Sequence, residues 1–210
     1  SRIIAGATAV YGAEEIERSY GQVQPVPESR VVVAEDGHVV DHNGRPLLCL
    51  DTPGHARHHY CVWDARSACW FTGDTFGLSY RELDGPQGPF ILPTSSPVQF
   101  EPEALKQSIA RMLAYEPQGM YLTHYDRVGS SYAEVEKLAQ DLYEQINAME
   151  ALGRDADGKP DRHAKLLEAL ATLYLQRARA AQVPLEDAQI ERALAMDIEL
   201  NAQGLACWLD

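Results

Sequence analysis

Short runs of alternating apolar and polar positions fill residues 30–72 and predict β-strands. The runs are separated by the turn pairs Asp36-Gly37 and Asn43-Gly44. Strands are expected over residues 30–34, 39–41, 47–51, 59–63 and 68–72. Their close spacing predicts an antiparallel meander or a mixed sheet. Ahead of them, residues 13–18 carry a short helical pattern that ends at Gly21.

The hydrophobic period changes to that of helices after residue 102. Pro102 suits a first helical position, and Ser131-x-x-Glu134 is a plausible capping box for the next helix. Between these helices, residues 119–122 resemble another strand. Two more helical stripes follow, the second starting at Pro184, and we interpret both stripes as core packing or a homodimer contact. Residues 84–102 are rich in Pro and Gly and predict a long surface loop.

A polar break over residues 153–160 is the best candidate for a boundary. We therefore predict a sheet-bearing part over residues 1–152 and a helical C-terminal extension over residues 153–210. The fold class expected from this order of elements is α/β (α+β).

The composition of the chain limits the classes of partner that it can bind. The chain has 210 residues, of which 45% are hydrophobic and 23% charged, as in soluble globular proteins. A net charge of −13 argues against a nucleic-acid partner, because little cationic surface faces the phosphates. No apolar run approaches the roughly 20 residues of a membrane span, so we expect no membrane partner. Four cysteines without a C-x-x-C pair predict buried free thiols and a cytoplasmic location.

Three side chains that can bind metals follow strand-like runs. His55 comes after Thr52-Pro53-Gly54, Asp74 after Phe71-Thr72-Gly73, and His124 after Tyr121-Leu122-Thr123. Taken singly, each is more typical of a surface residue, a turn or a cap. Together they are donors of the types that bind Zn²⁺, Fe²⁺ or Mn²⁺. We therefore predict that the three converge on a metal site.

Other polar side chains near these motifs are weaker candidates. His59 begins the next strand and could support a ligand or face a substrate, although a surface position suits it equally. Tyr80 could offer its phenol to an oxyanion, although packing is the more common role of an aromatic residue there. Asp126 and Arg127 could form a supporting pair beside His124.

The three motifs together resemble the third, fourth and fifth metal-binding motifs of the metallo-β-lactamase superfamily. The Phe-Thr-Gly-Asp-Thr string is particularly similar to that of the hydroxyacylglutathione hydrolase branch. The resemblance covers about residues 1–150. It implies the second half of an αβ/βα sandwich, to which C-terminal helices are added. It also implies two divalent metal ions, zinc first and iron or manganese as alternatives, with His55 on one, His124 on the other and Asp74 bridging both.

The superfamily's other ligands come from a His-x-His-x-Asp-His loop in the N-terminal half of the sandwich, and this chain contains no such string. We therefore expect the natural protein to be longer at its N-terminus. The basic residues that bind glutathione in the hydrolase branch also have no recognisable counterpart, so a glutathione thioester is not predicted.

The function that this resemblance implies is metal-dependent hydrolysis. A metal-bound water would attack a small-molecule ester, lactone, thioester or similar bond. Two alternatives stay open: an iron-dependent persulfide dioxygenase on the same scaffold, and a non-catalytic scaffold or dimerisation protein that has lost the site.

Overall fold

The computed structural model describes residues 4–6, 8, 12–95, 97 and 99–210, which form parts of two compact units, Ser1–Val33 and Ala34–Asp210. The first unit contains helix α2 (Ala13–Tyr20) and the 3₁₀ turn η1 (Glu28–Arg30). Gly21 follows α2 with a φ of +56°, which a glycine adopts without steric cost. The short helix predicted at residues 13–18 is therefore confirmed.

The strand predicted over residues 30–34 is wrong. Arg30 closes the turn η1, Val31 is extended, and residues 31–35 belong to no strand of the described sheet. Val31, Val32 and Val33 are all exposed. A run of β-branched residues becomes a strand only where a neighbouring strand and a core accept it, and neither is present here.

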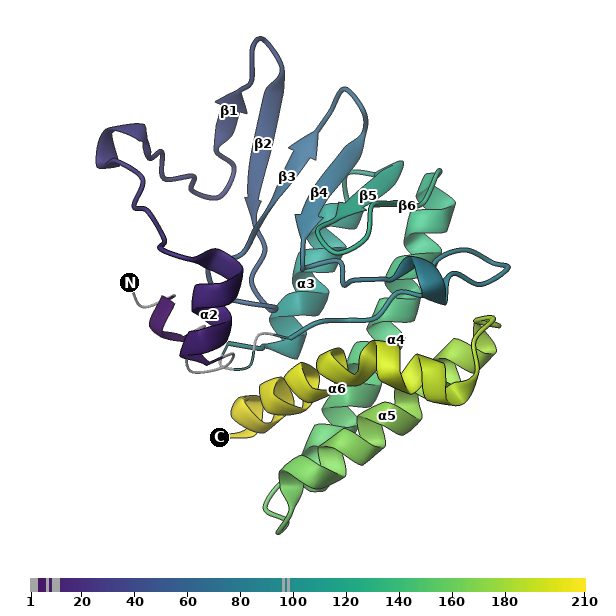
Figure 1. Ribbon diagram of the computed structural model, residues 1–210. Helices are drawn as coiled ribbons and strands as arrows, with labels where there is room; N and C mark the ends of the chain where they lie inside the picture. Colours follow the sequence, from purple (N-terminus) through teal and green to yellow (C-terminus); the bar gives the residue numbers. More distant parts are fainter. Residues whose placement is uncertain (1–3, 7, 9–11, 96, 98) are drawn as a thin grey trace. The chain divides into compact units, whose positions relative to one another are not determined.

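The second unit is built on a six-stranded sheet with its strands in chain order (Figure 1). The strands are β1 (Val39–Asp41), β2 (Pro46–Asp51), β3 (Tyr60–Asp64), β4 (Cys69–Gly73), β5 (Gly119–Leu122) and β6 (Arg127–Val128). The first four form the predicted antiparallel meander. Strand β5 pairs parallel to β4 after a long crossover, and β6 returns antiparallel, so the sheet is mixed.

Four helices belong to this unit: α3 (Pro102–Leu113), α4 (Tyr132–Ala156), α5 (Arg162–Ala180) and α6 (Asp187–Leu209). Ser131 caps α4 by accepting from the N–H of Glu134. The carboxylate of Glu134 returns to the N–H of Ser130 instead of Ser131, so the predicted capping box is only half formed. The last helix begins at Asp187, three residues after the predicted Pro184, where Glu186 and Gln189 make a complete box.

The predicted boundary at residues 153–160 coincides with the end of α4. Gly153 lies inside α4 against the ring of Trp208 from α6, and the chain leaves the helix only after Ala156. The division into residues 1–152 and 153–210 stays a prediction, as does a homodimer contact. The predicted core packing of the C-terminal stripes is confirmed, because Leu166, Leu170, Tyr174, Ile190 and Leu194 are buried.

Helices α3 and α4 lie against one face of the sheet, and α5 and α6 pack on α4. Trp70 and Met120 are paired across β4 and β5 and are fully buried on that face. The indole N–H of Trp70 donates to the carbonyl of Met112 in α3 at 3.0 Å, which ties the sheet to this helix. Side chains therefore alternate between this helix-covered face and an opposite one.

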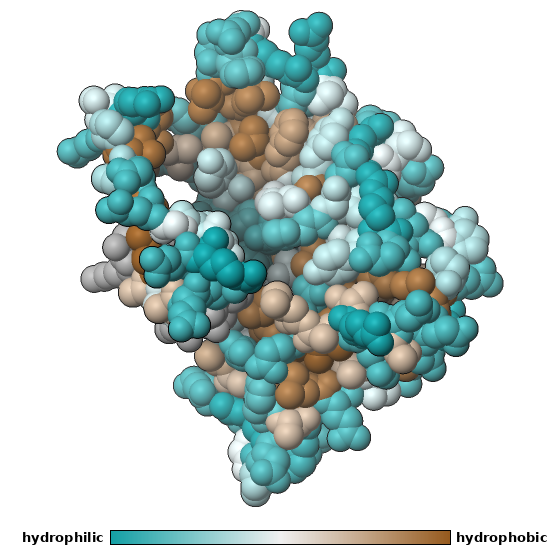
Figure 2. Space-filling model, in the orientation of Figure 1, coloured by the Kyte–Doolittle hydropathy of each residue, from teal (hydrophilic) through white to brown (hydrophobic). Residues whose placement is uncertain are grey.

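The opposite face is apolar and open. Val62, Phe71 and Tyr121 follow one another across β3, β4 and β5, and the rings of Phe71 and Tyr121 stack with 5.0 Å between centroids. Phe71 is 47% exposed and Tyr60, on the same face, 53%. Figure 2 shows apolar surface over the strands in the upper part of the view. We call this surface the open sheet face.

The Pro- and Gly-rich segment of residues 84–102 is less exposed than predicted. Phe90, Ile91 and Leu92 are buried, and Leu92 bridges to Leu78. A buried irregular segment needs partners for its peptide groups. The amide of Gln145 supplies one of them by donating to the carbonyl of Ile91 at 2.8 Å.

The four cysteines are free thiols as predicted. Cys49, Cys61 and Cys69 are also buried as predicted, whereas Cys207 is exposed, so the prediction of burial is wrong for that residue. Within the described part of the chain, no helix combines the length and the apolar character that crossing a membrane requires.

Candidate metal centre

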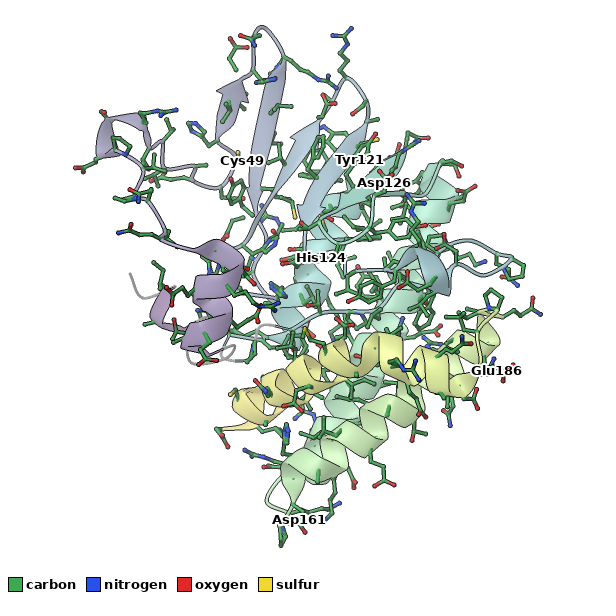
Figure 3. The ribbon with its side chains drawn as sticks, viewed as in Figure 1. Cys49, Tyr121, His124, Asp126, Asp161 and Glu186 are labelled. Atoms are coloured by element: carbon green, nitrogen blue, oxygen red, sulfur yellow. The ribbon has the colours of Figure 1, made fainter. Side chains whose placement is uncertain are left out.

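The structure brings His55, Asp74 and His124 together beside the ends of β2, β4 and β5. The Nε2 atom of His55 lies 3.5 Å from Oδ2 of Asp74, and Nε2 of His124 lies 3.4 Å from Oδ1 of the same carboxylate. Figure 3 shows His124 near the lower ends of the strands. Asp74 therefore stands between two imidazoles and presents a different oxygen to each.

The turn before His55 is held against α3. Gly54 has a φ of +126°, and a Cβ atom on it would clash with the backbone of Leu105. Its carbonyl accepts from the N–H of Glu101 at 2.8 Å, and Ser108 donates to the carbonyl of Pro53 at 2.7 Å. Pro53 and Gly54 thus pack closely against α3 at the end of β2, and this packing fixes the position of His55.

His55 is held in one tautomer. Its Nδ1 lies 3.1 Å from the carbonyl oxygen of Thr94, which can only accept, so Nδ1 carries the hydrogen. Burial lowers the pKa of His55, which favours the neutral ring. In the neutral ring, Nε2 bears a lone pair, and that lone pair faces the carboxylate of Asp74.

Asp74 is positioned through its backbone. Its N–H donates to Nε2 of His59 at 2.9 Å, and Nδ1 of His59 lies 2.9 Å from the hydroxyl oxygen of Thr75. Burial, followed by the proximity of His55, lowers the pKa of His59 to about 4, so its ring is neutral at neutral pH. Because Nε2 of His59 accepts from Asp74, it has no lone pair to offer a metal. His59 therefore supports the candidate site through the backbone of Asp74.

His124 follows β5 and is the most accessible of the three, with 57% of its side chain exposed. Its carbonyl accepts from the N–H of Ser79 at 3.4 Å, and the N–H of Thr123 donates to the carbonyl of Gly73 at 3.4 Å. These contacts join the segment that carries His124 to the segment that carries Asp74.

The carboxylate of Asp74 fits a cation ligand. Its Oδ1 is buried and has no hydrogen-bond partner among the described residues, which is costly for a charged oxygen. Two donors bound to one tetrahedral zinc at about 2.1 Å each stand about 3.4 Å apart. The separations of Asp74 from His55 and from His124 are of that size.

The described residues contain no group of three or more donors close enough to hold a metal ion. The reason is visible in the geometry: Asp74 makes two separate pairs, one with each histidine, instead of one cluster. Each pair offers one imidazole nitrogen and one carboxylate oxygen. Two such donors are fewer than the three or four protein ligands of a zinc site.

Tyr80 and Asp126, also singled out in the sequence, are engaged elsewhere. The phenol of Tyr80 donates to Asp197 in α6 at 2.9 Å, so that hydrogen is not directed at an oxyanion. Asp126 pairs with Arg81 at 2.9 Å. The supporting side-chain pair with Arg127 is not formed, because that guanidinium donates to the carbonyl of Gln118. Their catalytic or supporting roles stay predictions.

Sequence reasoning missed the contributions of Thr94, Asp197 and Asn201. Thr94 acts through its carbonyl, which every residue has, so its identity carries no signal. Asp197 and Asn201 lie within the second C-terminal helix, for which the sequence predicted only core packing or a homodimer contact. The available signal was a pair of polar residues four positions apart, on the helix face that also carries apolar residues.

No protein-family model and no curated protein matches the sequence. Solved structures do match. An archaeal metallo-β-lactamase superfamily protein from Sulfolobus tokodaii is 21% identical, with a TM-score of 0.57 over 97% of this chain and 62% of that chain. A β-lactamase domain protein from Burkholderia ambifaria is 15% identical, with a TM-score of 0.53 over 100% of this chain and 52% of that chain.

These similarities show the fold: the chain carries the metallo-β-lactamase fold, as the resemblance of its three motifs to that superfamily implied. It spans less than two thirds of the length of either neighbour. The match to the first neighbour takes in most of the C-terminal helices, since it covers 97% of this chain.

Proposed function

We propose that this chain is part of a metal-dependent hydrolase that acts on a small-molecule ester, lactone, thioester or similar bond. One observation carries the proposal. The carboxylate of Asp74 faces imidazole nitrogens on two sides, at 3.5 and 3.4 Å, while its Oδ1 has no hydrogen-bond partner among the described residues. On the His55 side, a nitrogen lone pair faces the carboxylate, and a cation between the two groups would stabilise this arrangement.

In this proposal His55 and Asp74 would hold one divalent cation, and His124 and Asp74 would hold a second. Bound there, the cations would supply Lewis acidity for activating water and stabilising a developing oxyanion. Other residues of the chain orient these ligands. The carbonyl of Thr94 keeps the lone pair of His55 directed inward, and His59 holds the peptide of Asp74.

The remaining donors would come from polypeptide that packs on the open sheet face. Two observations support this part of the proposal. The open sheet face is apolar but exposed, with Phe71 at 47% and Tyr60 at 53%. The solved structures of the same fold are also considerably longer than this chain. A second β-layer on that face would bury the apolar side chains.

The deciding measurement is metal content per chain, by elemental analysis of protein purified without chelators, beside the variant Asp74→Asn. We expect close to two Zn, Mn or Fe per chain in the complete protein and a large loss in the variant. Turnover of ester, lactone and thioester panels should then depend on the metal.

Other results would contradict the proposal. One iron per chain with sulfur-dependent oxygen uptake would instead favour a persulfide dioxygenase. Absence of metal from the complete protein, even after incubation with Zn²⁺, would favour a scaffold that has lost the site.

A further inference from the structure

Two polar residues of α6, Asp197 and Asn201, are buried on the same side of the helix, one turn apart. Asp197 is 7% exposed and Asn201 1%. Buried polar groups on a helix that packs largely through apolar residues need partners. Both residues find them in segments that adjoin the candidate metal centre.

Asn201 holds the segment around Thr94 from both sides. Its Oδ1 accepts from the N–H of Ser95 at 2.9 Å, and its Nδ2 donates to the carbonyl of Pro93 at 3.0 Å. Both hydrogen bonds are buried, and together they fix the backbone on either side of Thr94. The carbonyl of Thr94 is the group that accepts from Nδ1 of His55. Asn201 is therefore separated from a candidate ligand by one short stretch of immobilised backbone.

Close packing of α6 against the same segment is independent evidence. Gly204 faces Ser95 with no room for a side chain, because an added Cβ would clash with the side chain of Ser95. The hydroxyl of Ser95 also donates to the carbonyl of Leu200 at 3.3 Å. Ser95 is thus contacted by Leu200, Asn201 and Gly204, which lie within little more than one turn of α6.

Asp197 makes the corresponding contact one turn earlier. It accepts from the phenol of Tyr80 at 2.9 Å. Tyr80 directly follows Ser79, whose N–H donates to the carbonyl of His124. This second connection is longer, since it passes through the backbone of Ser79 and a hydrogen bond of 3.4 Å.

We propose that α6 positions the metal centre, with Asn201 as the positioning residue for His55 and Asp197 as a weaker one for the segment that contacts His124. The C-terminal helices are then part of the site's architecture and not only packing. The role of His55 as a metal ligand rests on the proposed function, whereas the control of its ring by α6 does not.

The test compares the variant Asn201→Leu with Tyr174→Phe. Asn201→Leu keeps the branched skeleton of the side chain and removes both bonds to the 93–95 segment. Tyr174→Phe removes the third partner of the same amide, an acceptor at 2.7 Å, and leaves the 93–95 segment untouched. The first readout is the tautomer of His55 in metal-free protein, observed by ¹⁵N NMR of the imidazole. The second is the affinity for Zn²⁺.

We expect the Nδ1–H tautomer of His55 in the wild type and in Tyr174→Phe, and a mixture of tautomers in Asn201→Leu. Loss of support for a metal-ligating histidine typically costs 10- to 100-fold in affinity. We expect a loss of this size for Zn²⁺ in Asn201→Leu and little change in Tyr174→Phe.

A second pair of variants tests the inference if Asn201→Leu does not fold. Gly204→Ala pushes on Ser95 without touching Asn201, and alanine favours the helix. Gly153→Ala makes the same change at the contact of α4 with Trp208, where an added Cβ would come to 3.2 Å from the ring. The inference predicts an altered His55 tautomer in Gly204→Ala only.

An unchanged tautomer and unchanged Zn²⁺ affinity in the folded Asn201→Leu or Gly204→Ala variant would overturn the inference. If the tautomer responds as expected but the wild type binds no Zn²⁺, the proposed function fails while the positioning of His55 by α6 stands.

Discussion

The imidazole of His59 accepts a hydrogen bond from the backbone N–H of Asp74, with 2.9 Å between Nε2 and the nitrogen. The ring occupies the space that a side chain on Gly73 would need. Because the hydrogen bond uses the backbone of Asp74, its carboxylate stays directed at His55 and His124. A histidine in the motif thus serves the site without offering it a donor.

Replacing His59 by Leu should weaken metal binding, because the peptide of Asp74 loses its acceptor and reorients. We expect a 10- to 100-fold loss of Zn²⁺ affinity, measured by competition with a chromophoric chelator. The variant His59→Gln places an oxygen near the position of Nε2 and should recover most of the affinity. The exposed neighbour His58, replaced by Ala, is the matched control. Equal affinities in the Leu and Gln variants would argue against the hydrogen bond as the cause.

Gly73→Ala should destabilise the protein for two separate reasons. Its φ of +51° costs an L-residue about 1 kcal/mol, and its Cβ would strike the ring of His59. Gly158, with a φ of +63° and open space around it, isolates the first effect. Urea unfolding should show a loss of about 1 kcal/mol for Gly158→Ala and a larger loss for Gly73→Ala. Metal affinity should fall in the Gly73 variant alone, and a fall in both variants would count against a local effect.

Asp74→Asn should separate metal binding from stability. The amide replaces a partly exposed carboxylate whose buried Oδ1 has no hydrogen-bond partner among the described residues. In metal-free protein we therefore expect the melting temperature to stay the same or rise, because functional groups are often kept at the expense of folding stability. Bound metal and turnover should be lost. A variant that unfolds without metal, or keeps its metal, would contradict the assignment of Asp74.

The ion pair of Arg45 with Asp64 should make stability sensitive to acid. Hydrogen bonding from Arg45, followed by that from Ser67, holds the pKa of Asp64 well below its usual range. Below about pH 4 the unfolded chain takes up a proton at Asp64 that the folded chain does not, so this stabilisation is lost as pH falls further. Asp64→Asn should cost about 2 kcal/mol at pH 7. Urea unfolding of both proteins at pH 7, 4 and 3 should show that difference shrinking below pH 4, and a constant difference would refute the linkage.

The sequence alone located the strands from residue 39 to 72, the helix at Pro102 and the strand before His124. It did so because alternation and turn pairs are local properties, and these segments also meet a core that agrees with them. The run at residues 30–34 has the same local preference but no neighbouring strand, so there the same reasoning failed.

The candidate ligands could also be found from the sequence, since each closes a strand-like run with a side chain that binds metals. The distances between these three side chains could not be predicted from the sequence. They depend on the parallel pairing of β5 with β4 across a crossover of more than forty residues. The tertiary structure alone also decided that His59 accepts from Asp74, that Thr94 orients His55, and that Asn201 reaches this segment from α6. Those roles depend on hydrogen bonds to peptide groups, which every residue carries alike, so only the packed chain shows which of them a side chain meets.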